Sequence, residues 1–99
     1  MTKITITKSE HETGGKFVAT VEGTDATGEQ TFSRVNDHLI IVDHTGVDDE
    51  LAGQGIAKAL TENLIHDARG NGYRIVPLCP YVRAQSLKHP EWDDVIVKK

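Results

Sequence analysis

The second half of the chain alternates apolar and amphipathic segments, and this alternation limits the folds open to it. An apolar run at residues 39–42 is followed by a glycine-containing segment, a stretch with apolar residues at helical spacing at about 54–69, and a second apolar run at 73–79. Short apolar runs predict buried strands, and the helical spacing predicts an amphipathic helix. A strand, a helix and a strand of these lengths predict a βαβ unit with parallel strands and a right-handed crossover. Because the first run is apolar at every position, we expect a central strand that is buried on both faces and covered by helix on at least one side.

Details of this unit predict where it opens and where it ends. Pro77 interrupts the second apolar run, and because proline has no N–H to donate, we expect the two parallel strands to separate near it. Such a gap is where α/β sheets bind ligands. Gly70 is placed to end the helix in the left-handed conformation. Residues 81–92 predict a short helix, and three apolar residues are expected to anchor the C-terminus: Trp92, Val95 and Ile96.

The first half of the chain predicts an antiparallel meander. Apolar and polar residues alternate at 3–8, 16–22 and, less regularly, 29–35, as expected of half-buried strands. Turn-forming segments at 10–15, 23–28 and 36–37 separate them. The predicted fold class is therefore α+β with a mixed α/β sheet: an antiparallel N-terminal meander, then a βαβ unit with two splayed parallel strands and a short C-terminal helix. The length of 99 residues fits one domain over residues 1–99.

Charge and composition exclude several partners. Fifteen acidic residues against eleven basic ones give a net charge of −4, which argues against nucleic acid, because binding to a polyanion needs a basic face. No apolar run approaches the length of a membrane span, and the first residues lack a leader-like apolar segment. The single cysteine allows no intrachain disulfide, and the five histidines show no metal-ligand spacing. We expect a cytoplasmic protein without a metal site that contacts neither nucleic acid nor membrane.

The junction between the first apolar run and the helix indicates a class of ligand. A loop, Gly53-Gln54-Gly55, runs straight into the helix. Free backbone N–H groups and the positive end of the helix dipole therefore meet at one point, where a phosphate or pyrophosphate can bind. Such a site needs few basic side chains. Taken alone, the loop is equally well read as a plain helix start that uses glycines for its turn.

In its order of segments the chain resembles the GCN5-related N-acetyltransferase superfamily. The acetyl-CoA loop of that superfamily has the pattern (Arg or Gln)-x-x-Gly-x-(Gly or Ala); Gly55 and Ala57 match it, and Ala52 stands where Arg or Gln is usual. The resemblance is closer to the very small members. These carry segments like IVDHTGV at 41–47, IVPLCPYV at 75–82 and HPEW at 89–92. The similarity covers roughly residues 39–95, and it implies acetyl-CoA binding and acetyl transfer to an amine.

The resemblance also implies which residues bind acetyl-CoA. Backbone N–H groups of six consecutive residues are expected at the pyrophosphate: Gly53, Gln54, Gly55, Ile56, Ala57 and Lys58. Small residues at 55 and 57 would let the backbone approach the phosphates. Thr45 and Val47 are expected to line the pantetheine arm. Tyr81 is expected either to donate a proton to the CoA thiolate or to be a packed aromatic. The hydrogen bond that Ala52 cannot make is worth roughly 1.5–3 kcal/mol.

His44 and Cys79 are the predicted catalytic residues. His44 follows the first apolar run, and a histidine suits the removal of a proton from an amine near neutral pH; a histidine that only positions the loop is the alternative. Cys79 ends the second apolar run, where the thioester is expected. Three roles are open to Cys79: taking the acetyl group covalently, donating a proton to the departing thiolate, or filling a buried space.

We therefore expect an N-acetyltransferase that uses acetyl-CoA as co-substrate and acetylates an amine that the sequence does not identify. The alternative is a non-catalytic acyl-CoA-binding or regulatory module, because residues 23–29 leave no room for the two helices that usually wall the acceptor site of the superfamily. An open acceptor site suits a protein substrate, a homodimer that completes the pocket, or no acceptor. The glycine spacing is not that of a generic nucleotide-binding domain.

Overall fold

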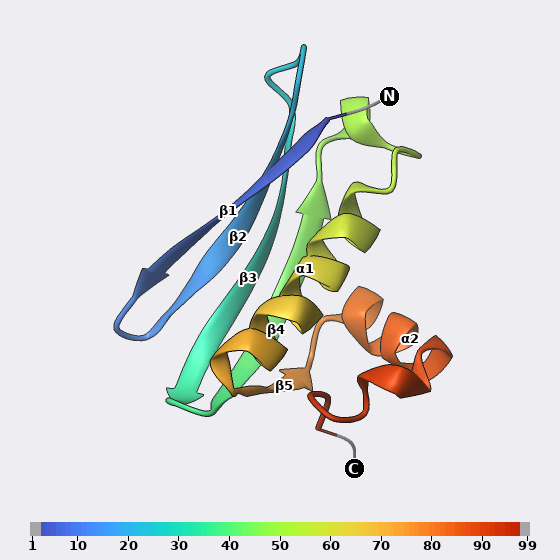
Figure 1. Ribbon diagram of the computed structural model, residues 1–99. Helices are drawn as coiled ribbons and strands as arrows, with labels where there is room; N and C mark the ends of the chain where they lie inside the picture. Colours follow the sequence, from blue (N-terminus) through green and yellow to red (C-terminus); the bar gives the residue numbers. More distant parts are fainter. Residues whose placement is uncertain (1–2, 98–99) are drawn as a thin grey trace.

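The computed structural model describes residues 3–97, which form a five-stranded sheet in the order β1-β2-β3-β4-β5 with helices packed against it (Figure 1). Neighbouring strands are antiparallel from β1 to β4, and β5 is parallel to β4, so the predicted mixed sheet is confirmed. The elements are β1 (Ile4–His11), β2 (Gly14–Val21), β3 (Thr27–Asn36), β4 (Leu39–Val47), the 3-10 turn η1 (Asp49–Leu51), α1 (Ile56–Asn71), β5 (Arg74–Pro77), α2 (Pro80–Lys88) and the 3-10 turn η2 (Pro90–Trp92).

The N-terminal meander is held by tight turns and close backbone contacts. His11 pairs with Gly14, so a turn of two residues closes the β1–β2 hairpin. A β-carbon on Gly14 would lie 2.3 Å from the carbonyl oxygen of Phe32, so β2 and β3 approach here as only glycine allows. Phe17 and Ala19 alternate with more exposed neighbours along β2 and are buried beneath α1. This is the period-2 pattern that predicted the strand.

Helix α1 crosses one face of the sheet, and its apolar side forms the centre of the core (Figure 1). Leu60, Leu64 and Ala68 are fully buried, and each buried leucine contributes roughly 1.5–3 kcal/mol. The prediction that Gly70 ends the helix is wrong. The helix runs on to Asn71, and Gly72 takes the left-handed conformation (φ 72°) and donates its N–H to the carbonyl of Ala68.

Strand β4 is longer and less enclosed than the sequence predicted. It extends to Val47, five residues beyond the apolar run that ends at Val42. Ile40 and Val42 are buried against α1, whereas Ile41 on the opposite face is only half-buried. Burial on both faces is therefore wrong, whereas the expected helix cover on at least one side is confirmed by α1.

The C-terminal segment is anchored beside β5. Ile75 donates its N–H to the carbonyl of Val95 (2.7 Å) and accepts from the N–H of Val97 (2.8 Å). Trp92, Val95 and Ile96 are all buried, as predicted. The predicted helix at 81–92 is divided into α2 and η2. No helix in the described part of the chain has the length and apolar character needed to cross a membrane.

Candidate active site

The parallel strands β4 and β5 separate at Pro77, as the sequence predicts. Their pairing ends where Val42 lies opposite Pro77. The N–H of Cys79 still donates to the carbonyl of Val42 (2.9 Å), and α2 begins at the next residue. Because β4 continues to Val47, residues 43–47 have no strand beside them on the β5 side among the described residues. Their backbone groups on that side are left for water or a ligand.

A bulge in β4 adjoins this gap. Thr31 of β3 pairs with His44, but the next residue, Phe32, pairs with Val42, so Asp43 is an extra residue on β4. A bulge bends its strand and changes the direction of the side chains that follow, and bulges are common next to active sites. Beyond the bulge, β4 pairs with β3 but no longer with β5.

His44 lies within β4, two residues after the apolar run, and is exposed. Thr45 pairs with Gln30, whose side chain is buried beneath α1, so Thr45 points toward α1 and His44 points to the opposite face. A β-carbon on Gly46 would lie 3.0 Å from Nε2 of His44, which shows that the imidazole lies over Gly46. The side chains of His44 and Thr45 therefore lie on opposite faces of β4.

Cys79 is buried (2% exposed) and is the N-cap residue of α2. Its Sγ atom lies 3.3 Å from Oγ1 of Thr45, on the strand edge that faces the gap. The sulfur thus stands at the positive end of a helix of nine residues and beside a hydroxyl group. Both features suit a thiol or thiolate, whether that of the protein or of a ligand.

Two polar residues of this region were missed by the sequence reasoning. Gln30 and Thr61 are fully buried. Nε2 of Gln30 lies 3.0 Å from Oγ1 of Thr45 and 3.3 Å from Oγ1 of Thr61, which in turn donates to the carbonyl of Ala57 (2.9 Å). The available signal was that Gln30 occupies an inward-facing position of β3, two residues before Phe32.

The glycine loop before α1 needs glycine for its backbone conformation. Gly53 and Gly55 have φ values of 80° and 75°, and Gly55 is the N-cap residue of α1. A β-carbon at either position would meet no atom within 4 Å, so the requirement is conformational in the ligand-free protein. The first helical hydrogen bond runs from Ala59 N–H to Gly55, which leaves the preceding N–H groups without helical acceptors. This exposed helix start can accept an anion.

Tyr81 stands on the first turn of α2 and is half-buried against the core. Burial, helped by the negative charge of Glu62, raises the pKa of Tyr81. The phenol is therefore protonated at neutral pH and able to donate a hydrogen bond. Lys58, on the first turn of α1, is exposed. No group of three or more potential metal ligands occurs among residues 3–97.

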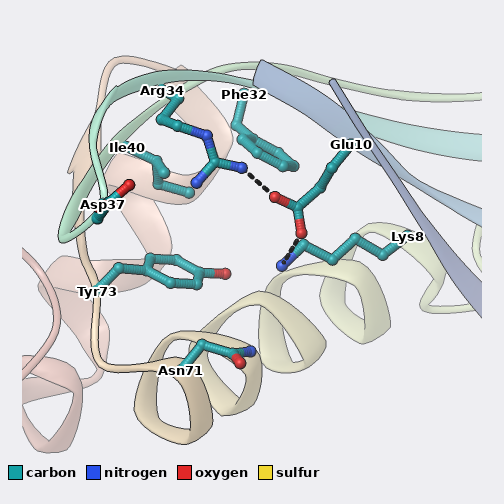
Figure 2. Close-up of a pocket in the computed structure, with 8 residues that line it drawn as sticks. All are labelled: Lys8, Glu10, Phe32, Arg34, Asp37, Ile40, Asn71 and Tyr73. Atoms are coloured by element: carbon teal, nitrogen blue, oxygen red, sulfur yellow. Dashed lines mark hydrogen bonds and ion pairs between the residues drawn. The ribbon is translucent and has the colours of Figure 1, made fainter. Parts of the chain in front are cut away.

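A second feature lies at the other end of α1, roughly 20 Å from the loop by helical rise. It is a polar pocket of about 190 Å³ bounded by β1, β3 and the end of α1. Figure 2 shows Glu10 between the side chains of Lys8 and Arg34, with Tyr73 facing them. Lys8 and Arg34 are both paired with Glu10, and none of the predicted site residues lines this pocket.

Comparisons with known proteins identify the family. The sequence profile of the GCN5-related N-acetyl-transferase family matches residues 16–95. The chain belongs to this family. The family's fold is found in the NMR solution structure of a GCN5-like candidate N-acetyltransferase from Staphylococcus aureus. That protein is 31% identical, with a TM-score of 0.69 over 94% of this chain and 89% of the other. A search of curated proteins finds no match.

Proposed function

We propose that this GCN5-related protein binds acetyl-CoA and transfers the acetyl group to an amine. Two observations together carry the proposal: the positive-φ loop at Gly53 and Gly55, which follows β4 in the chain and begins α1, and the gap at Cys79, where β5 leaves β4. The first is suited to a pyrophosphate. The second is suited to a thioester, because unpaired strand groups and a sulfur stand together there.

In direct transfer, the nitrogen of a neutral amine attacks the thioester carbonyl and the C–S bond breaks. His44, through a water if needed, takes the proton from nitrogen, since a histidine accepts protons near neutral pH. Tyr81 supplies a proton to the departing CoA sulfur. Backbone N–H groups of residues 43–47 stabilise the negative charge that develops on the carbonyl oxygen.

In a covalent route, Cys79 acts first. Its thiolate attacks the carbonyl, acetyl-Cys79 forms, and CoA leaves as a thiol after protonation. The amine then attacks acetyl-Cys79, releasing the thiolate of Cys79 and the acetylated product. The position of His44 on the opposite face of β4 from Thr45 favours its contact with the amine over contact with Cys79.

Binding is tested by urea or thermal unfolding with and without CoA. A ligand at 100 times its Kd adds about 2.7 kcal/mol to the free energy of unfolding. The matched control is Gly55→Val, in which a branched side chain is forced into the left-handed conformation at the N-cap. We expect stabilisation of the wild type that is absent from this variant; no stabilisation of the wild type at millimolar CoA contradicts the proposal.

The route is tested by mass spectrometry after incubation with acetyl-CoA. A mass increase on Cys79 that is lost when an amine is added supports the covalent route, and turnover retained in Cys79→Ala supports direct transfer. A non-catalytic CoA-binding module is the second candidate. It is favoured by the short β2–β3 connection, residues 22–26, which carries no helix to wall an acceptor. CoA binding without turnover on small amines, peptides or proteins selects it.

A further inference from the structure

Four side chains, three of them buried and Thr45 half-buried, form a continuous chain of hydrogen bonds between α1 and the gap. Thr61 and Gln30 are fully buried, and Cys79 is 2% exposed. These hydrogen bonds run from the carbonyl of Ala57 to Oγ1 of Thr61 (2.9 Å), on to Nε2 of Gln30 (3.3 Å), then to Oγ1 of Thr45 (3.0 Å) and finally to the sulfur of Cys79 (3.3 Å). They therefore join the first turn of α1 to the sulfur of Cys79, the N-cap residue of α2.

The direction of each hydrogen bond follows from the number of hydrogens available. The hydroxyl of Thr61 has one hydrogen, and it is donated to the carbonyl of Ala57. Thr61 can then only accept from Gln30, so the Nε2 group of Gln30 must face the two hydroxyls. The second hydrogen of Nε2 goes to Thr45. Gln30 thus makes Thr45 an acceptor and leaves the hydrogen of Thr45 free.

That free hydrogen has a consequence at the sulfur. While Cys79 is a thiol, its S–H donates to Oγ1 of Thr45. Once the proton has left, Thr45 can turn its own hydrogen toward the sulfur and donate to the thiolate. An acceptor in place of Gln30 would draw that hydrogen away.

Stability alone does not account for Gln30. Its Oε1 atom is buried and has no hydrogen-bond partner among the described residues. An unpartnered buried acceptor destabilises the fold, and an apolar side chain at this inward position would avoid that penalty. The Nε2 group, by contrast, meets two hydroxyls, and this points to a role for that half of the amide.

We propose that Gln30 is a positioning residue that holds the Thr45 hydroxyl ready to donate a hydrogen bond to the sulfur in the β4–β5 gap. In the covalent route that sulfur belongs to Cys79, and in direct transfer it is the departing sulfur of CoA. The proposal rests on the proposed function for its catalytic meaning. The geometry on which it depends is testable without CoA.

The first test uses the ligand-free protein, in which Cys79 is the single cysteine, so the Raman S–H stretching band reports one group. We expect a hydrogen-bonded band in the wild type and in Thr45→Ser, and an unbonded band in Thr45→Val. In Gln30→Met the S–H band should broaden toward the unbonded position. The three-bond couplings to the Thr45 methyl, which report a single side-chain rotamer in the wild type, should take values averaged over several rotamers. Wild-type bands and couplings in Gln30→Met overturn the proposal.

An independent test uses the wild type and NMR, and it does not require Gln30→Met to fold. We expect two slowly exchanging side-chain amide protons for Gln30, each close to one threonine: nuclear Overhauser contacts to the methyls of Thr45 and Thr61. Rapid exchange of these protons or the absence of both contacts overturns the proposal.

The kinetic test separates positioning from a purely structural role. In Gln30→Met we expect kcat for acetyl transfer to fall about tenfold, the equivalent of 1.36 kcal/mol, with KM for acetyl-CoA unchanged. Gln30→Glu should lower kcat at least as much, because a carboxylate accepts the Thr45 hydrogen. The matched control is Ser86→Ala, which removes a buried hydroxyl of α2 that is not part of this chain of hydrogen bonds. It should leave kcat unchanged. Equal losses in Ser86→Ala and Gln30→Met contradict positioning.

Failure of CoA binding would remove the proposed function while leaving both ligand-free tests valid.

Discussion

The imidazole of His44 lies over Gly46, so closely that a β-carbon on Gly46 would stand 3.0 Å from Nε2. The contact is possible because both residues lie on the same face of β4, two positions apart. A glycine at 46 therefore gives the ring room to lie along the strand. The position of His44 depends on the absence of a side chain at Gly46, which makes Gly46 a means of moving the histidine without removing it.

Gly46→Ala should displace the His44 ring while leaving the fold intact, because the atom that must give way belongs to an exposed side chain. If His44 is the base, His44→Ala should lower the transfer rate by about 10²-fold or more, and Gly46→Ala should lower it by a smaller factor. Steady-state kinetics with acetyl-CoA and an accepted amine, alongside urea unfolding, measures both effects. Unchanged rates in both variants would leave His44 with no catalytic role.

The loop glycines should tolerate no side chain for conformational reasons. Gly53 and Gly55 hold φ values of 80° and 75° in open space, so Gly53→Ala and Gly55→Ala should each destabilise the fold by about 1–2 kcal/mol. Gly70→Ala is the matched control. Gly70 lies within α1, also in open space and without a positive φ, and its replacement should stabilise the protein by about 0.4–1 kcal/mol.

Urea unfolding followed by the fluorescence of Trp92, the one tryptophan, reports all three variants. Equal stability of Gly55→Ala and Gly70→Ala would show that the left-handed conformation at Gly55 does not persist in solution. The loop would then not be preorganised to bind an anion.

The βαβ unit was predictable because its pattern is local. The apolar run ending at Val42, the helical spacing before Gly70 and the proline at Pro77 each carry a signal within a few residues. The end of α1 was predicted two residues early, because Gly70 and Gly72 both satisfy the C-cap pattern and only the backbone conformation distinguishes them.

The second half of β4 was hidden by its bulge. Asp43 adds a residue, so the alternation that should mark Thr45 and Val47 as inward-facing is out of phase with Val42. For the same reason the sequence could not indicate that the side chains of His44 and Thr45 point to opposite faces of β4. Gln30 was missed since a polar residue in a strand is read as exposed unless its pairing partners are known.

Gly28 controls how closely α1 approaches the sheet. A β-carbon there would lie 2.7 Å from Cγ2 of Ile56, the first residue of α1. Gly28→Ala should therefore destabilise the protein by about 1–3 kcal/mol, and it should weaken CoA binding because the helix start must move. Adding Ile56→Leu, which removes the branch at Cβ, should recover part of both losses.

A double-mutant cycle from urea unfolding measures this coupling between Gly28 and Ile56. Strictly additive effects of the two substitutions would contradict direct contact. Recovery of stability without recovery of CoA affinity would separate the packing of α1 from the placement of its first N–H groups.

The polar cluster at the far end of α1 should make the protein sensitive to alkali. The phenol of Tyr73 donates to Asp67 (2.6 Å), and the ammonium of Lys8 lies 2.7 Å from the same carboxylate and 5.5 Å from the ring centre of Tyr73. Burial, the hydrogen bond to Asp67 and nearby negative charge raise the pKa of Tyr73. For Lys8, burial opposes the charge, but hydrogen bonds to Asp67 and Glu10 outweigh it and raise the pKa.

Both groups hold their protons more tightly in the folded state than in the unfolded chain. Their contribution to stability is therefore complete below the unfolded pKa values, about 10 for both, and is lost as pH rises through the folded values. We expect the free energy of unfolding to fall above about pH 10, and to fall less steeply in Tyr73→Phe, which has no phenol to ionise. Tyr81→Phe is the comparison variant: burial and the charge of Glu62 raise the pKa of Tyr81 as well, but Tyr81 does not share the hydrogen bond that Tyr73 donates to Asp67, so the slope should flatten less than in Tyr73→Phe. The same slope in Tyr73→Phe and the wild type would show that Tyr73 is not protected from ionisation by the fold.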